Sequence, residues 1–472
     1  MADEPSRLEW DLLSEKERLS QIREKLDDIE ERLVEVREDK PSLMISLRTI
    51  FSWRNYSVYL ATSWVFTAFS YMGLFLNLYL LEELSWDILL IGGVLSFSSA
   101  LSAISRFVGG YVGDVSNRKY LSVIAMFMMA IYNIIMGISD EFTWIFIAFL
   151  FFSAMDIFKG GSTAFIMDNI PKRHAGLGIS LFSAGGFLGI ITLGVFVILI
   201  PSLGFKTSLQ LMFLTGGLFL VICTIVRSLF LEGSVPENKR KGVSLFRDFI
   251  QENKRATELL FKAVPGMIAI VVLDSLSDSL FRFGAYIYIY QQVGIEITGL
   301  ALMSIATILI SVPMMLATGR MSDRKGEKKT ALVVYGIMPI SSLLLLIAPI
   351  FPFWAPNFLL THAESVFTGL SVIFSTPFLA IVLKSANDAV WTVLILIIIQ
   401  KNLPRKDTSK ILSVFWFIVY LLASIGPSIG GFVFEFLYQG YLFVIVLMIN
   451  IIILGWIAAR GLVKDDVFDK GK

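Results

Sequence analysis

Long apolar runs are the feature that most constrains the fold of this 472-residue chain. A helix that crosses a bilayer needs about 20 mostly apolar residues. The sequence holds six such runs, then about 30 polar residues (232–262), then six more. Charged residues make up 17% of the chain, below the roughly 25% typical of soluble domains. The sequence therefore predicts an all-α polytopic membrane protein with 12 transmembrane helices. The predicted spans are 55–80, 88–112, 119–138, 142–168, 175–201, 209–231, 263–290, 297–318, 330–350, 376–400, 409–437 and 440–460.

Positive charge in the loops tests this number of spans, because cytoplasmic loops accumulate Lys and Arg. The loops that follow even-numbered spans carry 20 such residues with their edges, whereas the opposite loops carry only Lys206. The chain is therefore expected in the cell membrane with both termini cytoplasmic. The stretch 351–375 is apolar, but it is interrupted by Pro352, Pro356, His362 and Glu364, so we interpret it as an extracellular insertion at the membrane surface.

The predicted domains follow from these spans. They are a cytoplasmic acidic amphipathic helix (1–50), an N-terminal six-helix bundle (51–231), a cytoplasmic linker (232–262), a C-terminal six-helix bundle (263–462) and a cytoplasmic tail (463–472).

The first 40 residues differ from the rest in composition and pattern. They hold 8 Lys and Arg against 14 Asp and Glu. Leu recurs every seven residues from Leu12 to Leu33, and Ile22, Ile29 and Val36 each follow one of the last three leucines by three residues. This heptad pattern is typical of a coiled coil, which would make a homodimer through residues 6–40. The alternative is a single amphipathic helix that lies on the rest of the protein or on lipid headgroups.

A loop motif occurs twice. The segment from Gly110 to Lys119 after span 2 recurs from Gly319 to Lys329 after span 8, 209 residues further along. This duplicated motif is similar to G-x-x-x-D-[RK]-x-G-[RK]-[RK] of the major facilitator superfamily, and the resemblance covers about 50–465. It implies the major facilitator fold: two six-helix bundles enclose a central cavity lined by spans 1, 4, 7 and 10, which opens alternately to either side.

The resemblance also implies a cytoplasmic gate. In relatives the motif Asp caps a facing helix, and the motif Arg pairs with the acid that ends span 4. The gate residues carried over are Gly110, Asp114, Arg118, Lys119 and Asp168 in the first half, and Gly319, Asp323, Arg324 and Gly326 in the second. Val115, Asn117 and Gln400 depart from the pattern. The alternative is that these loop charges only fix the topology.

Ionisable residues deep in spans cost several kcal/mol, so each is a candidate functional residue. The seven candidates for binding substrate or protons are Asp156, Lys159, Asp274, Asp278, Arg282, Lys384 and Asp388. All lie in spans 4, 7 and 10. The spacing places Asp274, Asp278 and Arg282 on one helix face. The depth of Asp156, Asp274 and Asp388 predicts that these three carboxylates approach one another near the midplane. The alternative is that all seven form static salt bridges.

Two features differ from the drug/proton antiporters of the superfamily. Asp156 stands where many of them have arginine, and the Gly-Pro-x-x-Gly-Gly signature expected in span 5 lies in span 11, from Gly426 to Gly431. Because small residues let helices approach closely, this stretch and the glycines of span 5 are both expected at the interface between the bundles.

The chain holds one Cys and two His, and it lacks a phosphate-binding loop. No metal, cofactor, nucleic-acid partner or enzymatic activity is therefore expected. The sequence predicts a secondary active transporter of a small organic solute, coupled to protons, with sodium as the other ion that carboxylates would serve. The alternatives are a lipid or lysolipid flippase, and a membrane sensor that signals through the N-terminal helix.

Overall fold

The computed structural model describes residues 43–168, 181–182, 184–233, 251, 253–255, 257–261, 265–310, 327–402 and 408–460. The chain divides into two compact units, residues 1–53 and 54–472. The described part of the first unit holds the helix α2 (Leu43–Ser52). The predicted coiled coil of residues 6–40 lies outside the described residues, so the dimer that it implies stays a prediction.

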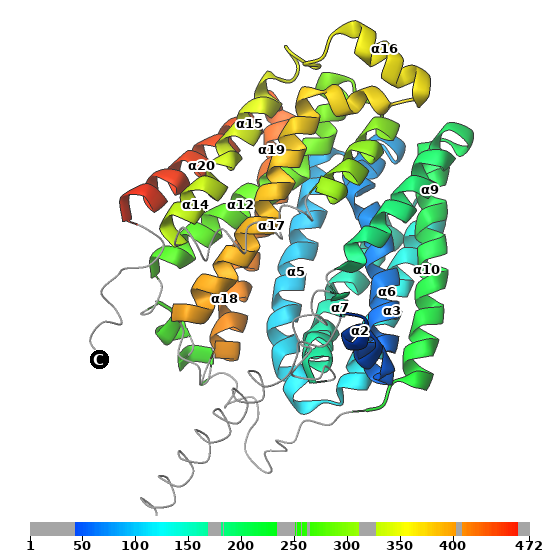
Figure 1. Cartoon of the computed structure of the whole chain (residues 1–472), viewed down its shortest axis with the longest axis vertical. Coiled ribbons are helices and arrows are strands. Elements are labelled where there is room, and N and C mark those ends of the chain that lie inside the picture. The colour runs from blue at the N-terminus through cyan, green and yellow to red at the C-terminus, as the bar shows by residue number, and fades with distance from the viewer. Residues whose placement is uncertain are drawn as a thin grey trace, which may run out of the picture. The chain divides into compact units, whose positions relative to one another are not determined.

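The second unit is helical over its described residues, and Figure 1 shows the order of the helices. A single β-bridge joins Phe353 and Ser375, and the described residues form no strand. The longer α-helices are α3 (Arg54–Ser70), α5 (Ile88–Val115), α6 (Arg118–Ile138), α7 (Phe142–Asp168), α9 (Leu188–Leu203), α10 (Phe205–Phe230), α12 (Pro265–Tyr288), α17 (Thr376–Asn402), α18 (Thr408–Ala423) and α20 (Gly440–Arg460). The shorter elements are η1 (Tyr71–Phe75), α4 (Leu76–Leu78), η2 (Tyr79–Glu83), η4 (Ala184–Phe187), η5 (Ile289–Val293), α14 (Glu327–Tyr335), α15 (Ile337–Ile347), α16 (Asn357–Val366), η6 (Leu370–Phe374) and α19 (Gly426–Phe436).

Eight helices among the described residues are long and apolar enough to cross a membrane, and a bent pair over residues 253–293 would make nine. The all-α membrane fold is therefore confirmed. Predicted span 10 is helical throughout as the 27 residues of α17, although α17 is not among the eight. Predicted spans 8 and 9 hold shorter apolar helices, at 297–310 and 331–347. The number of 12 spans stays a prediction.

Prolines explain two breaks within predicted spans. Proline lacks an amide donor, and its ring clashes with the carbonyl four residues earlier. Pro339 therefore disfavours a continuous helix through Tyr335, where α14 ends before α15 begins. Pro427 acts in the same way at Ala423, where α18 ends before α19.

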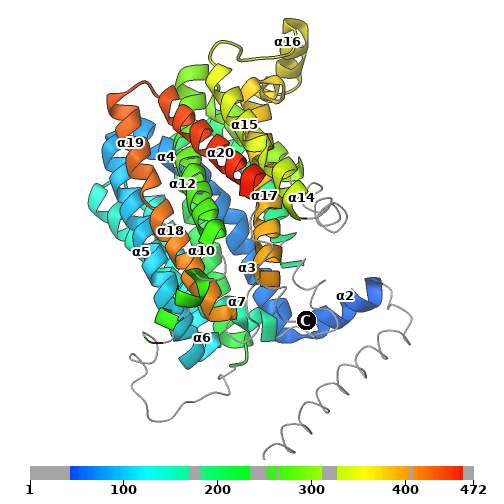
Figure 2. The same cartoon turned by 90° about the vertical axis from the view of Figure 1, so that its left-hand side faces the viewer.

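Glycines bring the two halves of the second unit together. A Cβ atom added to Gly92 of α5 would lie 2.5 Å from the Pro427 carbonyl oxygen, and one on Gly431 would lie 2.8 Å from the Ile88 oxygen. Helix α5 also contacts α18, where the Phe107 and Phe417 rings stack with centroids 4.6 Å apart. The expectation for the span 11 glycines is therefore confirmed, and Figures 1 and 2 show α5 beside α18 and α19.

The glycines of span 5 were expected at the same interface, and this expectation is wrong for the described residues. Cβ atoms on Gly185 and Gly189 would meet the rings of Trp64 and Tyr71, at 2.4 and 2.2 Å. These rings belong to span 1 of the same half. Close packing was predicted correctly, but the sequence pattern does not specify which helix is the partner.

The stretch 351–375 forms a short ordered insertion. Helix α16 and η6 lie between α15 and α17, and Figure 1 shows α16 at one end of the helices. The Glu364 carboxylate accepts the Gly369 amide at 2.8 Å and the Ser371 amide at 3.3 Å, which ties α16 to η6. No helix in this described stretch is long enough to cross a bilayer.

Candidate functional site

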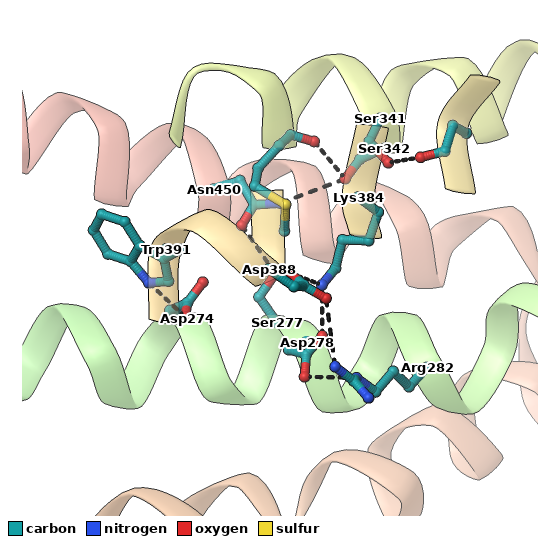
Figure 3. A network of polar contacts seen from close by, with 12 residues as sticks. Asp274, Ser277, Asp278, Arg282, Ser341, Ser342, Lys384, Asp388, Trp391 and Asn450 are labelled. Atoms are coloured by element: carbon teal, nitrogen blue, oxygen red, sulfur yellow. Dashed lines mark hydrogen bonds and ion pairs between the residues drawn. The ribbon is translucent and has the colours of Figure 1, made fainter. Parts of the chain in front are cut away.

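Four charged residues meet between α12 and α17. The Arg282 Nε donates to Asp278 Oδ2 at 2.8 Å, and its Nη2 lies 3.4 Å from Asp388 Oδ2. The Lys384 ammonium donates to Asp278 Oδ1 at 2.5 Å and also to Asp388 Oδ1. Two cations and two carboxylates thus form a closed group, drawn in Figure 3, which we call the four-charge cluster.

Burial differs within the four-charge cluster. The Lys384 side chain is 4% exposed, those of Asp278 and Asp388 are 29% and 27% exposed, and that of Arg282 is 66% exposed. A guanidinium that faced hydrocarbon in mid-span would cost several kcal/mol. The open side of the cluster is therefore expected to face water rather than lipid.

Asp274 lies one turn from the four-charge cluster but has other partners. Its two carboxylate oxygens accept the Trp391 indole N–H and the Tyr335 hydroxyl, both at 2.9 Å. The Tyr335 oxygen also lies 3.0 Å from Asn450 Oδ1, which accepts from Ser277 at 2.9 Å. Figure 3 shows Asp274 and Trp391 beside the cluster. Neutral donors from α14 and α17 thus fix the orientation of this carboxylate.

Asp156 is held within the first half. Its Oδ2 accepts Arg106 Nε at 2.8 Å, and Asp156 is 1% exposed. The Arg106 guanidinium also lies over the Tyr420 ring of α18, 4.6 Å from its centroid. Asp156 and Arg106 therefore form a pair on α7 and α5 that also contacts the second half.

Lys159 follows Asp156 by three residues on α7. Its side chain is exposed, and its ammonium lies 5.4 Å from the centroid of the Phe66 ring. Among the described residues, no carboxylate lies within ion-pair distance of it.

Arg227 of α10 is a second polar centre in the first half. The guanidinium is buried and donates to the Thr62, Ser63 and Ser122 hydroxyls at 2.7–2.8 Å, and it lies over the Tyr59 ring at 4.2 Å. Arg227 joins α3, α6 and α10, so we assign it a structural role in the packing of these helices.

The predicted carboxylate cluster differs from the observed contacts. Asp156, Asp274 and Asp388 each bind a different set of partners, and Asp156 does not join the other two. Depth along a helix was predicted, but the face toward which each side chain points depends on helix packing. The predicted shared face of Asp278 and Arg282 agrees with their ion pair, whereas the Lys384 and Asp388 pair, also four residues apart, was not predicted.

Several site residues were not among the seven candidates. Arg106 and Arg227 lie near predicted span ends, and Tyr335, Trp391 and Asn450 are uncharged. Asn450 could have been found, because a lone amide in an apolar run is a signal of a buried polar contact.

The predicted gate is only partly within the described residues. Gly110 lies in α5, and Arg118 and Lys119 begin α6. Asn117, a departure from the family pattern, caps α6 by accepting the Lys119 amide at 3.0 Å. The other gate residues, whose side chains or whole positions lie outside the described part, are Asp114, Asp168, Gly319, Asp323, Arg324 and Gly326. The gate therefore stays a prediction.

Membrane-crossing helices in two halves, with charges gathered between helices at mid-span, define a polytopic membrane protein with a polar centre. Among its described residues, no group of His, Cys, Asp and Glu is placed to hold a metal ion. The family model described as "Major Facilitator Superfamily" matches residues 58–390, and the chain belongs to that superfamily. Its apolar helices and its family make it an integral membrane protein.

One known protein is similar to the chain in sequence. "Multidrug resistance protein MdtG" of Enterobacter lignolyticus (strain SCF1) is 26% identical over 264 residues, which are 54% of this chain and 59% of that protein. The chain thus matches about three fifths of that relative's length.

Solved structures share the fold. The nucleoside transporter NupG matches with a TM-score of 0.62 and 14% identity, over 86% of this chain and 98% of that chain. The human organic anion transporter MFSD10 (TETRAN) matches with a TM-score of 0.56 and 18% identity, over 86% and 99%. A D-xylose-proton symporter matches with a TM-score of 0.55 and 15% identity, over 88% and 97%.

Proposed function

We propose that the chain is a secondary active transporter of a small organic solute, that protons drive it, and that it works by alternating access between bundles 51–231 and 263–462. The four-charge cluster carries this proposal. Its carboxylates are partly open to water within spanning helices, and a transported proton needs such a site. The fold also accommodates proton coupling, since one solved neighbour is a proton symporter.

The cluster supplies a physical link between protonation and helix packing. Lys384 shares one ammonium between Asp278 on α12 and Asp388 on α17. Protonation of either carboxylate removes one of the two ion pairs and leaves the lysine held by the other. Because Arg282 and Lys384 each bind both carboxylates, the loss of one negative charge changes the forces between α12 and α17.

Contacts between the two halves hold together their predicted extracellular ends, as expected for a conformation of the proposed cycle that is closed to the outside. Asn77 Nδ2 donates to the Phe283 carbonyl at 3.1 Å, and Gln291 Nε2 donates to Glu82 Oε1 at 2.8 Å. Glu82 and Gln291 lie at the predicted extracellular ends of spans 1 and 7. The proposal requires these contacts to break when the transporter opens to the outside, with the termini cytoplasmic as the loop charges predict.

The experiment measures solute flux into liposomes that hold the purified protein, with and without a pH gradient. Asp278→Asn and Asp388→Asn are expected to abolish gradient-driven flux while leaving the protein folded. Glu141→Gln, an exposed loop acid, is the matched control. Unchanged gradient-driven flux in both aspartate variants would contradict the proton role. Deletion of residues 1–40 separates a transporter from a sensor, because transport should survive it.

A further inference from the structure

Lys159 differs from the other cations in the described spans. Arg106 is paired with Asp156, and Arg282 and Lys384 are paired with Asp278 and Asp388. Arg227 has no carboxylate partner, but it is buried and its donors are occupied by hydroxyls. Lys159 is exposed, and among the described residues no carboxylate or hydroxyl accepts from its ammonium.

Lys159 lies deep within α7, where a charge without an ion-pair partner is costly. It lies nine residues before the end of α7, which corresponds to roughly 14 Å along the helix axis. A lysine at such a depth is costly in lipid, so such residues face a water-filled cavity or the interior of a bundle. Asp156, one turn earlier on α7, uses Oδ2 to accept from Arg106 and is not within ion-pair distance of Lys159.

The remaining charges nearby do not compensate Lys159. The four-charge cluster holds two cations and two carboxylates and is neutral when all are ionised, as is the Arg106 and Asp156 pair. The Asp274 carboxylate is engaged by Tyr335 and Trp391 of the second half. Arg106, Asp156 and Lys159 together therefore carry a net positive charge when all three are ionised, and no described carboxylate forms an ion pair with Lys159.

The structure assigns Lys159 as the binding residue for an anionic group of the transported solute, so that the substrate class is a small organic anion such as a carboxylate. This inference rests on the proposed transport function. Phe66 stands beside the ammonium and offers an apolar surface for the body of the solute. A carboxylate is the natural partner, because charge-assisted hydrogen bonds to an ammonium are stronger than neutral ones.

The test measures the thermal unfolding midpoint of the purified full-length protein as a function of probe concentration. The probes are 1-naphthoate, its uncharged analogue 1-naphthamide, and the lipophilic cation tetraphenylphosphonium. A ligand that binds the native state raises the midpoint by mass action. The variants are Lys159→Gln, Lys159→Arg, which keeps the charge, and Lys254→Gln, an exposed lysine outside the deep spans.

The expected result is stabilisation of the unmodified protein by 1-naphthoate but not by 1-naphthamide. Lys159→Gln should weaken this binding by about tenfold or more, since a hydrogen bond to a charged group is lost. Lys159→Arg and Lys254→Gln should retain it. Equal stabilisation of Lys159→Gln, stabilisation by the amide or the cation alone, or no stabilisation by 1-naphthoate would each overturn the inference.

Flux measurements separate this inference from the proposed function. Binding of 1-naphthoate that follows Lys159, without flux driven by a pH gradient, would contradict the proton-coupled function and leave the anion site in place. Gradient-driven flux of a solute that binds Lys159→Gln as well as the unmodified protein would contradict the anion site and leave the function in place.

Discussion

Arg106 Nε lies 2.8 Å from Asp156 Oδ2, and the two partners are buried to very different extents. The Asp156 side chain is 2% exposed, whereas that of Arg106 is 43% exposed and also lies over the Tyr420 ring. A buried charge that loses its partner is costly, while an exposed charge can be solvated. The pair should therefore respond unequally to the loss of either member.

Substitution at this pair tests that asymmetry. Arg106→Gln should lower the free energy of unfolding by about 3 kcal/mol, because it leaves Asp156 buried and unpaired. Asp156→Asn should cost less, since Arg106 keeps its exposed face and its ring contact. The double variant Arg106→Gln/Asp156→Asn should recover part of the loss. Unfolding midpoints in detergent measure all three, and equal losses in the two single variants would contradict the prediction.

Lys384 offers a second test, at the four-charge cluster. Lys384→Met should lower the free energy of unfolding by about 3–5 kcal/mol, because Asp278 and Asp388 then share Arg282 alone. Combining it with Asp388→Asn should recover part of the loss, since one carboxylate is neutralised with the lysine. Lys254→Met, at an exposed position, is the control and should change the unfolding midpoint little. A double variant less stable than Lys384→Met would contradict this account.

The sequence predicted the parts of this structure that depend on local pattern. Span positions follow from run length and hydropathy, and the shared face of Asp278 and Arg282 follows from helical spacing. Partners on different helices did not follow, as the contacts of Asp156 with Arg106 and of Asp274 with neighbouring helices illustrate. Which faces meet is set by packing of many side chains across the bundle, and one sequence does not encode that in any short pattern.

The neighbouring glycines of α5 allow a matched comparison of helix packing. A Cβ atom on Gly92 would lie 2.5 Å from the Pro427 oxygen, whereas one on Gly93 would have no atom within 4 Å. Gly92→Ala should therefore force α5 and α19 apart, lower the unfolding midpoint and reduce transport. Gly93→Ala should be neutral or slightly stabilising, because alanine favours a helix over glycine by up to about 1 kcal/mol. Equal effects of the two substitutions on the unfolding midpoint would show that the close approach of α5 and α19 does not contribute to stability.

Asp140, in the loop between α6 and α7, predicts a pH dependence of stability. Its Oδ2 accepts Lys206 Nζ at 2.5 Å, and its Oδ1 accepts Gln210 at 2.6 Å and the Tyr79 hydroxyl at 3.2 Å. Partial burial raises the pKa of Asp140, but the hydrogen bond and charge of Lys206 outweigh it, so the pKa lies below its ordinary value of 3.8. A carboxyl whose pKa is lowered by folding stabilises the native state above its ordinary pKa, and that stability is lost as the pH falls through the lowered value.

Asp140→Asn should consequently reduce stability at pH 6 by about 0.2–1 kcal/mol, a range set by the partial exposure of the ion pair. The difference from the unmodified protein should shrink as the pH falls below about 4, because the carboxyl of the unfolded chain takes up its proton first and the native carboxylate follows only at its lower pKa. Unfolding midpoints measured across this range, with the adjacent exposed acid variant Glu141→Gln as the control, test the prediction. If the difference in unfolding midpoint between Asp140→Asn and the unmodified protein stays constant from pH 6 to 3, the ionised form of Asp140 does not stabilise its contacts with Lys206, Gln210 and Tyr79.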